Sequence, residues 1–138
     1  MRTLALILML GAAGKSNAQM SAKDIYELNA KCSTEAERYF KEYYYSPYTT
    51  NPTVTFKNHY NQKLNKCLIQ VEILGNKPAE KRSWHTTIIT DVQEKVDYGS
   101  MLSDWRDGVY TLTFCQVSGN KCVSEGDFSD KSSPLMTQ

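Results

Sequence analysis

Residues 53–74, TVTFKNHYNQKLNKCLIQVEIL, carry the clearest structural signal in the chain. Apolar and polar side chains alternate through Thr53–Tyr60 and again through Cys67–Leu74, which is the two-residue period of a β-strand. The six residues between them, 61–66, are polar and rich in Asn and Lys, and such residues favour turns. The sequence therefore predicts two antiparallel strands joined as a hairpin.

Two more strands are predicted downstream of this hairpin. Arg82–Val92 is rich in Trp, Thr and Ile, and Val109–Val117 again alternates between two faces. The segment between these strands contains Gly, Ser and Asp, so we interpret it as an irregular connection. The expected sheet has about four strands.

An amphipathic helix is predicted ahead of the strands. Between Ser21 and Tyr45, apolar residues recur at steps of three and four, with Ser21 and Asp24 spaced as a capping box. Pro47 cannot continue such a helix. The predicted fold class is α+β, with this N-terminal helix packed on an antiparallel sheet. Residues 124–128 favour a short C-terminal helix that ends before Pro134.

The first eighteen residues are typical of a secretory signal peptide. Arg2 precedes an apolar run from Leu4 to Leu10, and small residues lead to a predicted cleavage after Ala18. The alternative is a buried N-terminal helix. The run is shorter than the roughly 20 apolar residues that cross a bilayer, so no membrane span is expected. We therefore predict a single domain over residues 19–138, exported to the periplasm or secreted.

The charge of the chain disfavours polyanionic partners. The 16 basic and 15 acidic side chains nearly cancel, and removal of residues 1–18 takes away two basic groups and no acid. A nucleic-acid-binding surface normally brings an excess of Lys and Arg. Nucleic acid is therefore not an expected partner, and no motif indicates a cofactor.

The four cysteines predict two disulfides, because exported chains fold in an oxidising compartment. Cys115 and Cys122 flank a tight-turn signal, so we pair them across a hairpin, and Cys32 then pairs with Cys67 by elimination. A structural zinc site is the alternative. Such a site uses closely spaced cysteine pairs that this chain lacks, so no metal site is expected.

Residues 58–67, NHYNQKLNKC, resemble a group of small bacterial exported proteins that share an N-H-Y-N-x-K-L-N-K-C run. In that group a cysteine in the first helix precedes the run, and a close cysteine pair follows near the C-terminus. Cys32, Cys115 and Cys122 occupy corresponding places here. The resemblance implies a bacterial exported protein and the same disulfide pairing, and it carries no activity or catalytic residue.

Two groups of residues are candidates for binding. Tyr44, Tyr45 and Tyr48 belong to a tyrosine cluster that a helix cannot bury completely, and exposed tyrosines are good contact residues. His59 and Tyr60 lie at the Asn-rich hairpin. The leading hypothesis is a non-enzymatic exported module, an accessory or inhibitor domain that binds a protein partner.

The alternative hypothesis is a small secreted hydrolase. His59 and His85 are the only histidines, and either can act as a general base with Asp91 or Glu72 as a nearby carboxylate. No Gly-x-Ser-x-Gly motif and no phosphate-binding loop is present, and bridged cysteines leave no thiolate nucleophile. No catalytic residue is therefore assigned. Isolated exposed aromatics and a hydrogen-bonded structural histidine are the competing explanations for these residues.

Overall fold

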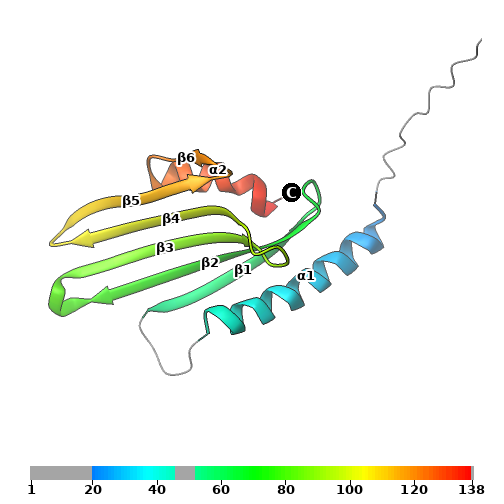
Figure 1. Cartoon of the computed structure of the whole chain (residues 1–138), viewed down its shortest axis with the longest axis horizontal. Helices are drawn as coiled ribbons and strands as arrows, with labels where there is room; N and C mark the ends of the chain where they lie inside the picture. The colour runs from blue at the N-terminus through cyan, green and yellow to red at the C-terminus, as the bar shows by residue number, and fades with distance from the viewer. Residues whose placement is uncertain (1–19, 46–51, 138) are drawn as a thin grey trace, which may run out of the picture.

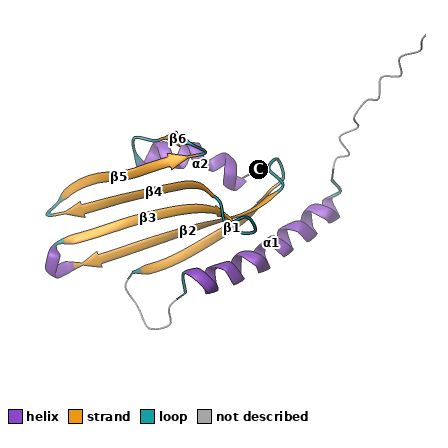
Figure 2. Cartoon of the chain, viewed as in Figure 1, coloured by secondary structure: helices purple, strands orange, loops and turns teal. Residues whose placement is uncertain are grey.

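The hairpin of residues 53–74 forms as predicted and begins a larger sheet. The computed structural model describes residues 20–45 and 52–137. Its elements, shown in Figures 1 and 2, are α1 (Ala22–Tyr43), β1 (Thr53–Asn61), β2 (Lys66–Lys77), a 3-10 turn η1 (Pro78–Glu80), β3 (Arg82–Asp91), β4 (Asp97–Arg106), β5 (Val109–Val117), β6 (Asn120–Lys121) and α2 (Glu125–Thr137).

In the described part of the chain the sheet has six strands, where about four were predicted. Each strand pairs antiparallel with the next in sequence, in the order β1-β2-β3-β4-β5-β6. The unpredicted long strand is β4, whose sequence DYGSMLSDWR contains the small and polar residues that usually mark turns. A glycine within a strand often marks a place where another group approaches the backbone closely. At Gly99 that group is the ring of Phe128, whose Cε2 lies 3.5 Å from the position that a Cβ atom would occupy.

The predicted N-terminal helix is continuous, and its start is fixed locally. Ser21 Oγ accepts a hydrogen bond from the Asp24 amide, and the Asp24 carboxylate accepts one from the Ser21 amide, which completes the capping box. Cys32 and Ala36 are the helix residues buried against β1 and β2. The small side chain at Ala36 allows the helix to approach the sheet closely.

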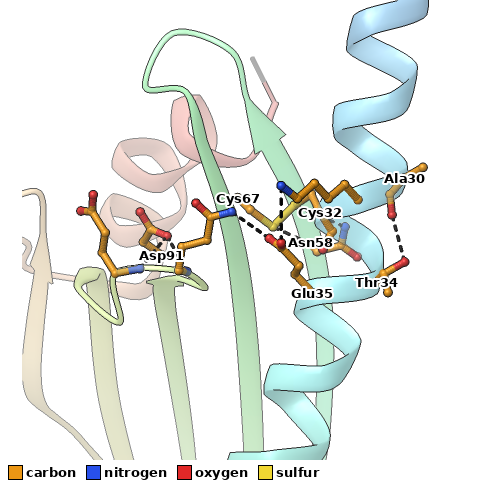
Figure 3. The surroundings of a disulfide bond; sticks show 10 residues. Ala30, Cys32, Thr34, Glu35, Asn58, Cys67 and Asp91 are labelled. Atoms are coloured by element: carbon orange, nitrogen blue, oxygen red, sulfur yellow. Dashed lines mark hydrogen bonds and ion pairs between the residues drawn. A yellow bond between two sulfur atoms is a disulfide. The ribbon is translucent and has the colours of Figure 1, made fainter.

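Both predicted disulfides are present. Cys32 of α1 is bonded to Cys67 at the start of β2, and Cys115 is bonded to Cys122 across the β5–β6 hairpin. Figure 3 shows the first bridge between the helix and the sheet, where the Asn58 amide lies 3.9 Å from Cys32 Sγ. On the loop-entropy description, closing the longer loop stabilises the fold by about 4 kcal/mol.

Strand β2 is buried on both faces. Cys67, Ile69 and Val71 point into a core beneath α1. Leu68, on the opposite face, joins Ile89 and Met101 in a second core beneath α2. The predicted meander is therefore covered by one helix on each face: α1 packs on the face of Cys67 and Ile69, and α2 packs on the face of Leu68.

Helix α2 is longer than predicted, because it continues through Pro134 instead of ending before it. Phe128 and Leu135 anchor the helix in the core. Asn61 also holds the helix: its Nδ2 donates to the carbonyl oxygens of Pro134 and Leu135, at 3.1 and 3.0 Å. These tertiary contacts stabilise a turn of helix that the proline alone disfavours.

The predicted signal peptide, residues 1–18, lies outside the described residues. Over the described part of the chain, no helix is both long and apolar enough to cross a membrane.

We expect Asn61→Ala to lower the free energy of unfolding by roughly 2–4 kcal/mol, because two helix carbonyls and the Leu64 amide lose a buried partner. Urea denaturation followed by circular dichroism measures this change. Gln62→Ala, on the exposed turn beside it, should change stability by no more than about 0.5 kcal/mol. Equal effects of the two substitutions would contradict the role assigned to Asn61.

Candidate functional site

The tyrosine cluster is divided between the core and the surface. Tyr44 is half-buried, and its ring stacks on Phe40 with the centroids 6.2 Å apart. Tyr45 is 62% exposed. Tyr48 lies outside the described residues. Of the three predicted contact residues, Tyr45 is thus the one that the structure places at the surface.

The Asn-rich hairpin has a structural role. Tyr60 is only 5% exposed, and its hydroxyl donates to the Asn65 side-chain oxygen, which closes the turn. The ring of Tyr60, which we predicted as a contact residue, belongs to the core beneath α1. His59 points to the opposite face, where it is half-buried on the α2 side.

The sheet keeps the two histidines apart. His59 is opposite Leu68 of β2, and His85 is opposite Leu74, six residues further along the same strand. At about 3.3 Å per residue, this register separates them by roughly 20 Å. Asp91 is fully buried and lies 3.1 Å from the Lys66 ammonium, so it is committed to an ion pair. Of the predicted catalytic pairs, only His85 with Glu72 shares a site.

That site is a groove between the sheet and α2, with a cavity of about 390 Å³. We call it the α2 groove. Its floor on the sheet includes Lys57, Gln70, Glu72, His85, Thr87 and Met101. Its wall on the helix includes Glu125, Phe128, Ser129, Ser132, Ser133 and Met136.

The floor of the α2 groove is polar, whereas the adjoining part of the same sheet face is apolar. Gln70 Nε2 donates to Glu72 Oε1 at 2.9 Å, and Thr87 Oγ1 lies 3.2 Å from His85 Nε2. Glu72 and Thr87 are directly opposite on neighbouring strands. Gln70 and Thr87 are buried, and buried polar groups stabilise a fold only when hydrogen-bonded. The floor therefore consists of two adjacent hydrogen-bonded pairs of side chains.

The wall is positioned at the start of α2. Ser103 of β4, fully buried and directly opposite His85, donates its hydroxyl proton to Glu125 Oε1 at 2.7 Å. Two residues further along α2, Asp127 Oδ2 accepts from the Val123 amide and from Lys131 Nζ, each at 2.9 Å. These contacts fix the helix over the sheet and hold the Glu125 carboxylate in the groove.

The α2 groove offers hydrogen-bonding groups, and the hydroxyls of Thr87 on its floor and of the neighbouring Ser103 are enclosed. The Ser103 hydroxyl is enclosed and already bonded to Glu125, and Thr87 is only 3% exposed. All four cysteines are in disulfides. The described residues contain no group of three His, Cys, Asp or Glu side chains placed to hold a metal ion. This arrangement supports reversible recognition of a ligand by hydrogen bonds and charge.

Sequence reasoning missed Gln70 and the helix residues of this site. Gln70 and Glu72 share one face of a strand that is otherwise strongly apolar, and that polar pair was the available signal. Glu125, Ser129 and Ser132 carried none, because only the crossing of α2 over the sheet brings them to β2 and β3.

No family model, no curated protein and no solved structure matches this chain. The functional conclusion therefore depends on the geometry of the α2 groove.

We expect the pKa of Asp127 to lie below the ordinary value of a carboxyl group, because the Lys131 ammonium and the Val123 amide both hydrogen-bond its charged form. A lowered pKa means that this carboxylate stabilises the fold above about pH 4, and that its contribution is lost as the pH falls through the folded-state pKa. Carbon-detected NMR titration of the side chain measures the midpoint. Lys131→Met should raise it, whereas an unchanged midpoint would refute the assignment.

Proposed function

We propose that this protein is an exported, disulfide-stabilised binding module, and that a segment of a partner protein occupies the α2 groove. The observation that carries the proposal is the preformed polar floor, Gln70–Glu72 beside His85–Thr87, under a cavity of about 390 Å³. Cavities of this size are typical of binding sites. The two disulfides suit an oxidising compartment, which supports export.

A chain segment fits the open end of the α2 groove. The groove reaches Lys57 and Asn58 on β1, which in the described sheet is an edge strand beside β2. An extended segment can therefore enter from the edge of the sheet and lie along α2. Ser129 and Ser133 on the exposed side of the helix wall, with the polar floor opposite, supply hydrogen-bonding groups for its backbone.

One observation favours the hydrolase alternative: His85, Thr87 and Glu72 are neighbours in a concave site. In that function His85 would act as a general base on a water molecule, with Glu72 nearby. The binding proposal predicts instead that residues 19–138 hydrolyse a chromogenic ester at the same rate with and without the His85→Gln substitution. A hydrolytic rate above solvent that disappears in His85→Gln would establish the enzyme.

Blocking the α2 groove should abolish capture of the partner. Ser129→Trp places a large side chain in the groove from an exposed position, whereas Asp130→Trp changes the next, exposed residue of α2, which does not line it. We expect a cross-linked pull-down from the native host, with residues 19–138 as bait, to recover one stoichiometric partner with the unmodified domain and Asp130→Trp. Recovery should fall at least roughly tenfold with Ser129→Trp, as for loss of a central contact.

Retention of the same partner by Ser129→Trp would show that the α2 groove is not the binding surface. Circular dichroism and thermal unfolding of both variants confirm that they fold, so that a loss of capture reports on the groove and not on stability.

A further inference from the structure

Within residues 20–45 and 52–137, two carboxylates in the α2 groove have no cationic partner. Six acidic residues of the described chain are buried or half-buried: Glu35, Glu72, Asp91, Asp104, Glu125 and Asp127. Four of them have a Lys or Arg nitrogen within 4 Å. Among the described residues, Glu72 and Glu125 form no such ion pair, and both line the same cavity.

Neutral donors hold these two carboxylates in place. Glu72 accepts from the Gln70 amide, and Glu125 accepts from the Ser103 hydroxyl. A neutral hydrogen bond orients a carboxylate without cancelling its charge. Lys57, on the rim of the groove, is exposed and makes no ion pair with either acid in the part of the chain that the structure describes. The groove is thus built to present negative charge in a partly desolvated cavity.

We propose that the α2 groove binds a guanidinium group, the side chain of an arginine in the partner segment. This inference rests on the proposed function and specifies its ligand. A guanidinium is planar, carries five donors and is less strongly hydrated than an ammonium, so it can donate to the carboxylates of this cavity while it is partly buried. The Thr87 and His85 side chains and Met101 complete the floor, with polar edges for the donors and an apolar surface for the arginine methylenes.

A free small molecule can supply the same guanidinium, so the test distinguishes the two sources. The probes are acetyl-Gly-Arg-Gly-amide, its neutral citrulline counterpart and agmatine, each titrated into ¹⁵N-labelled residues 19–138. We expect the arginine peptide to shift the backbone amides of the groove at millimolar concentration and to bind at least roughly tenfold more tightly than the citrulline peptide, because its hydrogen bonds are charge-assisted. Tighter binding of the peptide than of agmatine supports a protein segment as the source.

Charge-neutral variants identify the residues responsible. Glu72→Gln and Glu125→Gln keep the shape of the side chain, and each should weaken binding of the arginine peptide roughly fivefold or more, as expected for the loss of a charged hydrogen bond. Glu27→Gln is the matched control, because it removes one negative charge from the exposed face of α1, where Glu27 faces Lys23. It should bind like the unmodified domain.

Three outcomes would overturn the inference: equal affinity for the arginine and citrulline peptides, equal effects of Glu27→Gln and Glu72→Gln, or no groove shifts with any probe. Tighter binding of agmatine than of the peptide would show that the ligand is a free guanidinium compound and not an arginine of a partner protein. None of these outcomes bears on the pull-down with Ser129→Trp, which tests the proposed function separately. The partner could be lost with Ser129→Trp but retained by the Glu72→Gln and Glu125→Gln double variant. That result would support the binding module and reject arginine recognition by the groove.

Discussion

The structure depends on the burial of strand β2 on both of its faces. Successive side chains of a strand point to opposite sides, so Cys67 reaches the core beneath α1 while Leu68 reaches the core beneath α2. A shift of the register by one residue would exchange the two sets and separate Cys67 from Cys32. The disulfide and the alternation of this strand therefore specify the same register.

The α2 groove follows from the way that α2 crosses the sheet. The helix covers the apolar end of one face, around Leu68 and Ile89, and is held at its far end by Asn61 on the β1–β2 hairpin. Beyond the helix, the same face continues with Gln70, Glu72 and His85. A polar floor beside a helix wall is the geometric basis of the site, and the contacts at Ser103 and Asp127 that begin α2 also shape the groove.

The polar residues of this site differ from the distinctive residues of the Asn-rich hairpin. The Asn-rich hairpin is the most distinctive part of the sequence, and its side chains close a turn, approach the disulfide and hold α2. Distinctive composition there reflects structural hydrogen bonding. The proposed recognition surface uses less conspicuous residues, because a binding site needs correctly placed charge and hydrogen-bonding groups more than an unusual motif.

The sequence by itself determined the helix from Ser21, four of the strands, the α+β class and both disulfides, because these follow from local periodicity, capping and turn signals. It did not reveal β4, since Gly99 and Ser103 are weak strand signals, and their surroundings are completed by Phe128 and Glu125 from the distant α2. The tertiary structure alone decided that Tyr60 is buried, that His59 and His85 are far apart, and that Glu72 and Glu125 face one cavity. These outcomes depend on contacts between residues distant in the chain, such as Ser103 with Glu125 and Asn61 with Pro134, and local sequence patterns contain no information about such contacts.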